Sequence, residues 1–252
     1  MTGERIRDYH QKGYAVLRSV FTSKDLEVWR EECRRLLTLR DIINKNNLRT
    51  RFRTGMNGEY TFERFDPVVD LSPVFRTVAE DPRLIGPIKE LLADDVKLFK
   101  DKLIFKPPGQ HGYVLHQDYA WWQSFSPEDI CSVLVAIDSA DAQNGAVCFF
   151  PGYHRRLLTP LGEKRALSDK EAKLIPMSEG ELIEVQGGDI VIFHSQALHY
   201  SQPNYSHHTR RLFYPSFNAA RAGELYSVQY ALYREYVHGE MPDEDRAGVF
   251  FK

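Results

Sequence analysis

The second half of the chain is a succession of short apolar segments divided by turn residues, and this pattern restricts the fold more than any other feature. The segments are rich in aliphatic, β-branched and aromatic side chains, and they comprise residues 96–99, 102–105, 132–137, 146–150, 182–185, 189–194 and 211–217. Many strands in direct succession are typical of a sandwich or jelly roll, whereas βαβ units would place helices between them. We therefore predict a mainly β fold, a double-stranded β-helix (jelly roll, cupin-like), in which Asn144-Gly145 closes a tight hairpin.

The flanking parts of the chain predict helices packed on this core. Capping residues and helical spacing of apolar side chains indicate helices at 2–11, 22–39 and 81–92, with one strand at 14–17. No internal repeat or low-complexity linker interrupts the sequence, so one domain is expected over residues 1–252. Its predicted parts are a helical N-terminal part (1–95), the jelly-roll core (96–219) and a C-terminal helical cover (220–252).

Composition argues against several classes of function. The 33 basic and 35 acidic residues nearly balance, which gives no electrostatic basis for nucleic-acid binding. The three cysteines are far apart in the sequence, so neither a disulfide framework nor a zinc ribbon is indicated. No apolar run has the length of about 18 residues that predicts a membrane span, and no signal-peptide pattern opens the chain. We expect a cytoplasmic protein, monomeric or homodimeric, that acts on a small molecule.

His116-Gln117-Asp118 and the distant His199 form a candidate metal site. On a strand, residues two apart point to the same face, so His116 and Asp118 can reach one ion together. A second histidine from another strand would complete two imidazoles and one carboxylate, the facial set of non-haem Fe(II) oxygenases. His194 is the alternative second histidine, because it also ends a predicted strand. A zinc hydrolase would use a comparable set, but no general-base motif such as His-Glu-x-x-His accompanies it.

These residues are part of a longer series of motifs that resembles the phytanoyl-CoA hydroxylase-like family of Fe(II)/2-oxoglutarate dioxygenases. The motifs follow one another through the second half of the chain at residues 103–108, 116–118, 144–145, 150–154, 187–194, 198–201 and 210. One position departs from the family pattern, because Tyr153 precedes His154 where the family usually has serine. That residue belongs to a predicted turn, so the departure concerns local shape only.

The resemblance implies Fe(II), 2-oxoglutarate as co-substrate and O2, with three metal ligands, His116, Asp118 and His199, and no further catalytic side chain. It further implies that Arg210 and Ser201 bind the distal carboxylate of 2-oxoglutarate, which is costly to bury without a partner. The same resemblance implies that Lys102 lies near the co-substrate. It implies the same for Arg64, by a less close match of the sequence. Relatives that halogenate lack the carboxylate ligand, so Asp118 favours hydroxylation.

Two groups of side chains are candidates for contact with the substrate. Aromatic residues directly after the metal motif either line the pocket mouth or pack the end of the barrel: Tyr119, Trp121, Trp122 and Phe125. Arginines of the irregular stretch 40–67 would meet an anionic group such as a carboxylate, phosphonate or phosphate: Arg49, Arg51, Arg53 and Arg64. That stretch is either plain surface or a lid over the pocket.

We therefore expect hydroxylation of an unactivated C–H bond of a small-molecule metabolite, of natural-product, amino-acid or phosphonate type, with release of succinate and CO2. Two alternatives stay open. The same site could perform desaturation, epoxidation or rearrangement, or the chain could be a non-catalytic metal-binding jelly-roll module.

Overall fold

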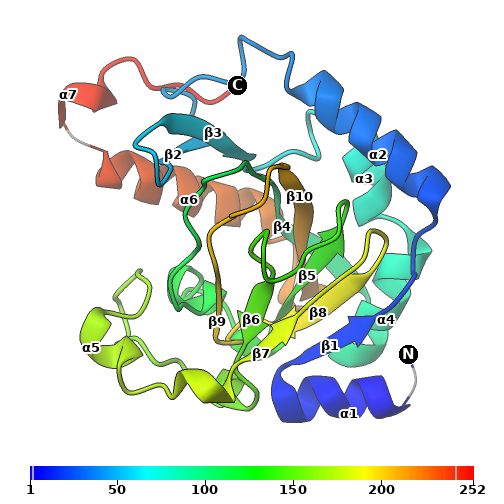
Figure 1. The fold of residues 1–252 in the computed structure, drawn as a ribbon. Helices are drawn as coiled ribbons and strands as arrows, with labels where there is room; N and C mark the ends of the chain where they lie inside the picture. The colour runs from blue at the N-terminus through cyan, green and yellow to red at the C-terminus, as the bar shows by residue number, and fades with distance from the viewer. Residues whose placement is uncertain (2, 242) are drawn as a thin grey trace.

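The computed structural model describes residues 1, 3–241 and 243–252, in which two antiparallel sheets lie against each other with helices around them (Figure 1). The large sheet has the order β1-β8-β5-β10-β4-β3-β2, and the small sheet has the order β7-β6-β9. The strands are β1 (Tyr14–Leu17), β2 (Thr50–Thr54), β3 (Tyr60–Phe65), β4 (Val96–Lys106), β5 (Ile130–Ala136), β6 (Val147–Phe149), β7 (Glu181–Ile183), β8 (Ile190–His194), β9 (His199–Ser201) and β10 (Arg210–Ala219). This arrangement confirms the predicted mainly β jelly roll.

Helices surround the sheets at both ends of the chain. The α-helices are α1 (Gly3–Lys12), α2 (Ser23–Leu36), α3 (Pro73–Ala79), α4 (Pro82–Leu92), α5 (Asp169–Ala172), α6 (Tyr226–Glu240) and α7 (Asp243–Arg246). The 3-10 turns are η1 (Asp118–Trp121), η2 (Pro127–Asp129), η3 (Tyr153–Arg155), η4 (Met177–Glu179) and η5 (Ala220–Ala222). In the described residues no helix is long and apolar enough to cross a membrane.

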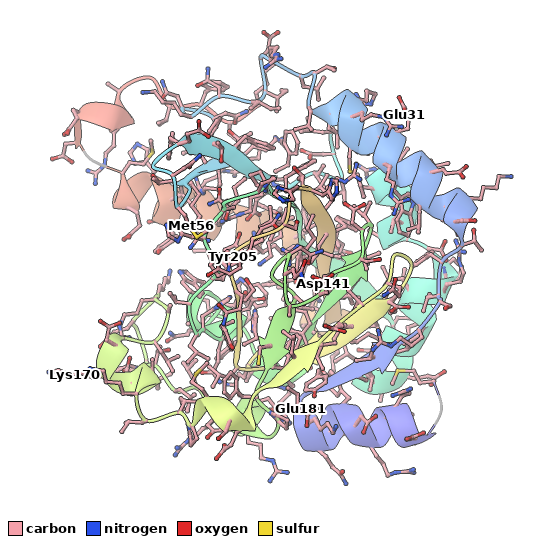
Figure 2. The ribbon with its side chains drawn as sticks, in the orientation of Figure 1. Glu31, Met56, Asp141, Lys170, Glu181 and Tyr205 are labelled. Carbon is pink, nitrogen blue, oxygen red and sulfur yellow. The ribbon has the colours of Figure 1, made fainter. Side chains whose placement is uncertain are left out.

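The large sheet is covered on both faces, which explains the unbroken apolar run of β5. Val133 and Val135 pack with α2, α3 and α4, whereas Leu134 and Ala136 face the small sheet. Every residue of β5 is buried, and a strand buried on both faces needs apolar side chains at every position rather than at alternate ones. Charged side chains such as Glu31 and Lys170 point outward from the molecule (Figure 2).

The structure differs from two local predictions and contains one helix that was not predicted. Residues 40–67 contain the hairpin β2–β3, which extends the large sheet beyond β4, and α3 precedes the predicted helix at 81–92. Asn144-Gly145 does not close a two-strand hairpin, because β5 pairs with β8 and β10 while β6 lies in the other sheet. The turn instead carries the chain from one sheet to the other, with Gly145 at φ +78°. The N-terminal third is therefore not only helical.

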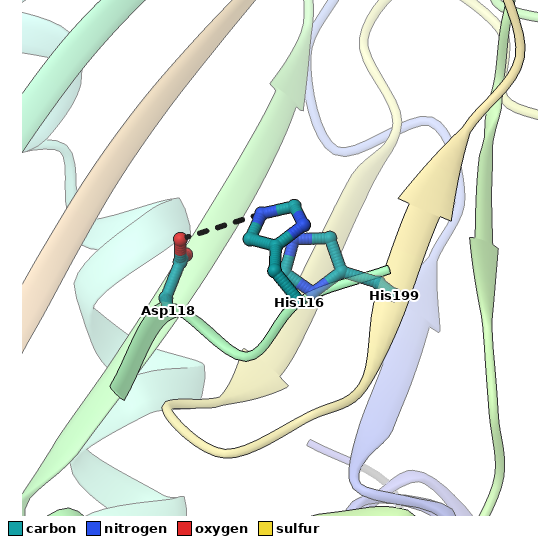
Figure 3. A group of neighbouring side chains, drawn as sticks. All are labelled: His116, Asp118 and His199. Carbon is teal, nitrogen blue, oxygen red and sulfur yellow. Dashed lines mark ion pairs between the residues drawn. The ribbon is translucent and has the colours of Figure 1, made fainter. Parts of the chain in front are cut away.

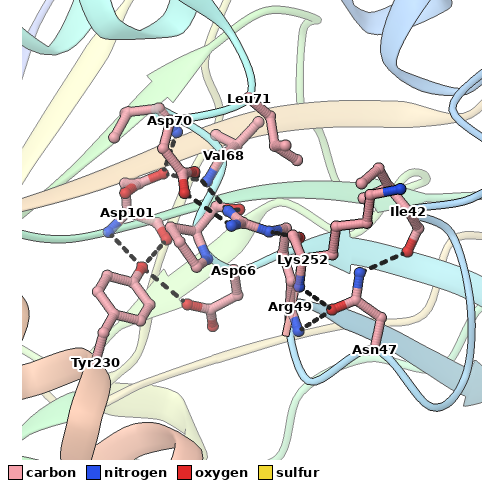
Figure 4. A network of polar contacts seen from close by, with 12 residues as sticks. Ile42, Asn47, Arg49, Asp66, Val68, Asp70, Leu71, Asp101, Tyr230 and Lys252 are labelled. Atoms are coloured by element: carbon pink, nitrogen blue, oxygen red, sulfur yellow. Dashed lines mark hydrogen bonds and ion pairs between the residues drawn. The ribbon is translucent and has the colours of Figure 1, made fainter. Parts of the chain in front are cut away.

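The C-terminal helix α6 is fastened to the large sheet by buried polar groups (Figure 4). The Tyr230 hydroxyl accepts a hydrogen bond from the Asp101 N–H at 3.1 Å and lies 2.6 Å from the Asp101 carbonyl oxygen. It is also 3.1 Å from Asp66 Oδ1, and the Lys100 ammonium pairs with the same carboxylate. These contacts hold α6 beside β4, where the helix forms a wall of the pocket described below.

Candidate metal centre and active site

His116, Asp118 and His199 converge on one point between the two sheets (Figure 3). Their candidate ligand atoms all lie within 4.8 Å of one another, and His116 Nε2 is 3.9 Å from Asp118 Oδ1. His116 and His199 are joined by two backbone hydrogen bonds of 3.0 Å, so the segment before η1 is paired with β9. Two imidazole nitrogens and one carboxylate at this spacing fit the facial ligand set of Fe(II).

The sequence predicted that the His-x-Asp motif lies on a regular strand, and this was wrong. The motif nevertheless keeps the alternating side-chain directions of a strand. His116 makes an isolated bridge and Asp118 opens η1. Gln117 between them is extended (φ −119°, ψ 125°), so its side chain points away from its two neighbours. Its amide nitrogen donates to the carbonyls of Arg156 at 2.8 Å and Gln196 at 2.7 Å, and its oxygen accepts from the Leu158 N–H at 2.7 Å. These bonds lock the turn that presents both ligands.

Both histidines are oriented with Nε2 toward the metal position. The Nδ1 atoms lie 2.7 Å from the Val114 carbonyl in His116 and 2.9 Å from the Ala197 carbonyl in His199. A carbonyl only accepts, so each Nδ1 carries the proton and each Nε2 has a free lone pair. Burial, followed by the neighbouring His199, lowers the pKa of His116 to about 3, and burial also lowers the pKa of His199. Neutral imidazoles are the form that binds a metal.

The third ligand is an ionised carboxylate. Burial disfavours the charge on Asp118, but the Lys102 ammonium 3.7 Å away, together with smaller contributions from the other surrounding groups, outweighs burial and lowers the pKa of Asp118 to about 2. His194, the alternative second histidine, lies elsewhere: its Nδ1 accepts from the Gln196 N–H at 3.0 Å and its Nε2 is 3.5 Å from Glu128. The geometry therefore favours His199 as the second histidine.

Of the residues expected to bind the co-substrate, Lys102 contacts the triad, and Arg210 shares the inner face of the large sheet with Leu212. Arg210 begins β10, is only 2% exposed, and donates through Nη1 to the Gly145 carbonyl at 2.5 Å. Its Nε is buried without a hydrogen-bond partner. Ser201 lies two residues after His199 on β9, and Lys102 lies on β4 beside Asp118. Sequence reasoning did not assign Lys106, a buried cation whose Nζ donates to Ser201 Oγ at 2.9 Å.

A pocket of about 530 Å³ opens beside the triad, and His116 and Asp118 form part of its lining. Five of the residues expected to contact substrate also line it: Arg51, Arg53, Arg64, Trp121 and Trp122. The remaining lining residues come from β4, from nearby loops and from the α6 region: Asp66, Lys100, Lys102, Ile104, Tyr113, Val114, Lys164, Ala166, Gln229, Leu232, Tyr233, Tyr236, Val237, Glu240 and Met241. The sequence did not predict that α6 forms part of the pocket, because its aromatic residues are equally typical of a helix that packs on the hydrophobic core.

Three predicted substrate residues lie outside the pocket lining, and one of them, Phe125, packs edge-on against Phe99. The Tyr119 hydroxyl donates to the Phe125 carbonyl at 2.8 Å, and its ring packs in a cluster with Phe99 and Ile130. Arg49 binds Asp70 through Nη2 at 2.7 Å and stays in the polar network near the chain end (Figure 4).

Comparisons with known proteins agree with this geometry. The family model "Phytanoyl-CoA dioxygenase (PhyH)" matches residues 9–212. Methylphosphonate hydroxylase of Gimesia maris is 33% identical over 141 residues, 56% of this chain and 52% of that protein. A 2-aminoethylphosphonate dioxygenase of an uncultured bacterium is 27% identical over 172 residues, 66% of this chain and 63% of that protein. The chain thus aligns with only about half to two thirds of the length of these relatives.

A solved structure shows the same fold. EctD from S. alaskensis, crystallised with 2-oxoglutarate and 5-hydroxyectoine, superposes with a TM-score of 0.75 at 19% identity. The match covers 88% of this chain and 77% of that chain.

Proposed function

The chain belongs to the phytanoyl-CoA dioxygenase family, and from this premise we propose that it is an Fe(II)- and 2-oxoglutarate-dependent dioxygenase that hydroxylates an unactivated C–H bond of a small-molecule metabolite. The observation that carries the proposal is the triad of His116, Asp118 and His199, whose ligand atoms lie within 4.8 Å of one another and of which His116 and Asp118 line the 530 Å³ pocket. Two imidazoles and one carboxylate leave open positions on the ion for a co-substrate and O2. Release of succinate and CO2 accompanies this reaction class.

The chain's own residues supply binding and orientation. When bound, the metal and 2-oxoglutarate provide the oxidising chemistry. Arg210 and Ser201 are placed to bind the distal carboxylate, since the buried guanidinium has no carboxylate partner among the described residues. The Lys102 ammonium helps to keep Asp118 ionised, and a further anion could bind to the ammonium beside the metal position. No side chain has to act as a general base for hydrogen-atom removal.

The charge of the pocket favours an anionic substrate of the phosphonate type. Six cationic side chains line it, against three acidic ones. Glu63, which does not line the pocket, pairs with Arg53 and Arg64. The charges of Fe(II) and 2-oxoglutarate would cancel each other, so the pocket keeps a surplus of about two positive charges. Both relatives described above are named for phosphonate substrates. A phosphonate dianion would neutralise the surplus.

Arg51 is the side chain best placed to meet that anion. It lies opposite Arg64 in the β2–β3 hairpin, and its Nη2 is buried without a hydrogen-bond partner. No acid of the described residues pairs with it, whereas Arg64 is 2.5 Å from Glu63. A guanidinium with a free N–H in a pocket is suited to bind a phosphonate or carboxylate oxygen.

Succinate release and product mass test the proposal. Purified protein with Fe(II), 2-oxoglutarate and O2 is offered simple alkyl- and aminoalkylphosphonates, the matching carboxylates, and neutral analogues. We expect succinate release stimulated most by a phosphonate, with a product heavier by one oxygen atom. A product lighter by two hydrogen atoms would establish desaturation instead, and stimulation by neutral analogues alone would refute the anionic class.

A further inference from the structure

One face of α6 lines the pocket over most of the length of the helix. The helix runs beside β4 and the β2–β3 hairpin (Figure 1), and its lining residues are Gln229, Leu232, Tyr233, Tyr236, Val237 and Glu240. Their spacing of three and four residues is that of a single helical stripe, which the helical rise makes about 16 Å long. The stripe is mainly aliphatic and aromatic, so a polar group in it that has no structural role is a candidate for contact with the substrate.

Gln229 is such a group. It is only 3% exposed, and its Oε1 has no hydrogen-bond partner among the residues that the structure describes. A buried acceptor without a partner is costly, and an apolar side chain of similar size would fill the same space without that cost. Since native proteins pair nearly all of their buried polar atoms, an unpaired amide in the wall of a pocket points to a ligand.

Three other buried amides of the chain bond to the backbone and so serve the fold. Asn47 donates from Nδ2 to a carbonyl at 2.9 Å and accepts a backbone N–H at 3.2 Å. Gln117 is bonded at both ends of its amide. Asn218 also has an unpaired Oδ1, but its Nδ2 donates to two carbonyls, at 2.8 and 3.1 Å, and it does not line the pocket. Gln229 thus combines burial, an unpaired amide oxygen and a place in the pocket wall.

The hydroxyl of Tyr233 is a second unpaired group, one turn further along the stripe. Within the described part of the chain it has no hydrogen-bond partner, and burial raises the pKa of Tyr233 to about 12, so the oxygen keeps its proton. The ring contacts two cations: its centroid is 4.2 Å from Lys100 Nζ and 5.4 Å from the guanidinium carbon of Arg51. Gln229 and Tyr233 therefore offer an acceptor and a donor, about 6 Å apart along the helix, beside the arginine proposed to bind the anion.

We propose that Gln229 and Tyr233 bind a neutral hydrogen-bonding group of the substrate, a hydroxyl or an amide, next to the anionic group held by Arg51. The inference rests on the proposed function, and it narrows the substrate class from simple alkylphosphonates to phosphonates that carry such a group. Gln229 is then a specificity-determining residue, because an analogue with a methyl group in place of the hydroxyl leaves the buried amide unpaired and binds less tightly.

The surrounding charges favour a neutral group over an ammonium. The charges of Arg51 and Arg64 act on Tyr233, and Lys100 contacts its ring, so an ammonium placed there would be repelled. Asp66, an acid of the lining, is already paired with Lys100 and lies 3.5 Å from Arg64 Nε. A hydroxyl both donates and accepts, so it can pair with an amide oxygen and with a phenol.

Anaerobic calorimetric titration of the protein loaded with Fe(II) and 2-oxoglutarate tests the proposal without turnover. The ligands are 2-hydroxyethyl-, 3-hydroxypropyl- and 4-hydroxybutylphosphonate. Each is compared with the alkylphosphonate in which a methyl group replaces the hydroxyl, and with the corresponding aminoalkylphosphonate. For at least one chain length we expect the hydroxyl compound to bind about tenfold more tightly than its methyl isostere, as for one or two neutral hydrogen bonds.

The Gln229→Met variant keeps the length of the side chain and removes the amide. We expect it to bind the hydroxyl compound and the methyl isostere equally, while its affinity for the methyl isostere equals or exceeds that of the wild type. Tyr233→Phe should reduce the preference for the hydroxyl compound in part. Tyr226→Phe is the control, because it removes a hydroxyl of α6 that donates to Asp101 Oδ2 at 2.9 Å outside the pocket lining, and it should leave the preference unchanged.

Thermal unfolding of the metal-free protein separates this role from a structural one. Gln229→Met removes an unpaired buried acceptor, so its melting temperature should equal or exceed that of the wild type. Asn47→Leu leaves a backbone N–H and a carbonyl unpaired and should lower the melting temperature. Retention of the hydroxyl preference by Gln229→Met overturns the proposal at any melting temperature. Loss of the preference in both Gln229→Met and Tyr226→Phe would reflect the stability of the helix and would also overturn it.

The wild-type titrations distinguish a failure of this inference from a failure of the proposed function. A wild type that prefers no hydroxyl compound at any chain length, or that prefers the ammonium compounds, overturns the neutral class and leaves the proposed function intact. If no phosphonate of the series binds to the protein that holds Fe(II) and 2-oxoglutarate, the proposed anionic substrate class itself fails, and the inference fails with it.

Discussion

At the residue scale, each histidine of the triad is oriented by the carbonyl of the residue two positions earlier. Val114 performs this role for His116 and Ala197 for His199. Because main-chain atoms make these bonds, neighbouring side chains can vary without changing the tautomer of the ligand. The polar side chain that matters locally is Gln117, whose buried amide anchors the turn between two ligands.

The substrate assignment makes a prediction for Arg51. Methionine keeps an unbranched side chain there but removes the free N–H donors and the cation–π contact with Tyr233, whose ring centroid is 5.4 Å from the guanidinium carbon. We expect the KM for a phosphonate substrate to rise roughly ten- to hundredfold, as for a lost charged hydrogen bond. The KM for 2-oxoglutarate serves as the internal control and stays unchanged. An unaltered KM for the phosphonate would place the anion elsewhere in the pocket.

At the scale of elements, the sequence predicted well those strands whose surroundings are wholly apolar. The run 132–137 corresponds to β5, buried throughout, and 189–194 corresponds closely to β8. The β2–β3 hairpin escaped prediction because its arginines face the pocket and an interior ion-pair network, so their polarity did not report exposure. The sequence also predicted that His116 and Asp118 lie close together, as the structure shows. It predicted a strand for this motif, whereas Asp118 opens the 3-10 turn η1.

Asn144-Gly145 was the other misread signal, and it yields a prediction for this connection. Gly145 has φ +78° and lies against the Gln202 carbonyl and Lys106 Nζ, so an added Cβ meets both conformational strain and a close contact. Gly58 in the β2–β3 turn has φ +82° with open space around it. Gly58→Ala should cost about 1–2 kcal/mol for the backbone alone, and Gly145→Ala should cost more. Urea unfolding of the two variants makes the comparison, and equal losses would refute the packing role of Gly145.

At the scale of the whole molecule, the pocket is built from distant parts of the chain. The β2–β3 hairpin, β4 and α6 each form one wall, and the ligands come from the segment before η1 and from β9. Local sequence pattern could not reveal this assembly, because it depends on contacts between α6 and β4, whose Tyr230 and Asp101 are 129 residues apart in the sequence. The grouping of the triad could be predicted because the order and spacing of motifs can be read from the sequence alone, and the structure brings these three residues together. The role of Arg210 stays a prediction.

The attachment of α6 predicts a clear difference between two tyrosines of that helix. Tyr230→Phe removes a buried hydroxyl shared by Asp101 and Asp66, and we expect the free energy of unfolding to fall by about 1–3 kcal/mol. Within the described part of the chain, the Tyr236 hydroxyl donates one exposed hydrogen bond, to the Lys164 carbonyl at 3.4 Å, so Tyr236→Phe should leave stability unchanged. Denaturant titration measures both. Similar values for the two variants would mean that the network in Figure 4 does not fasten the helix.

The central claim is that the triad and Arg210 together form one Fe(II)/2-oxoglutarate site. Anaerobic addition of 2-oxoglutarate to the Fe(II)-loaded protein should produce the visible charge-transfer band of a chelated 2-oxo acid. His199→Ala should abolish the band, and Arg210→Ala should weaken co-substrate binding by about ten- to hundredfold, as for a lost charged hydrogen bond. Absence of the band in folded, iron-bound wild-type protein would contradict the account and leave a jelly roll that binds metal for another purpose.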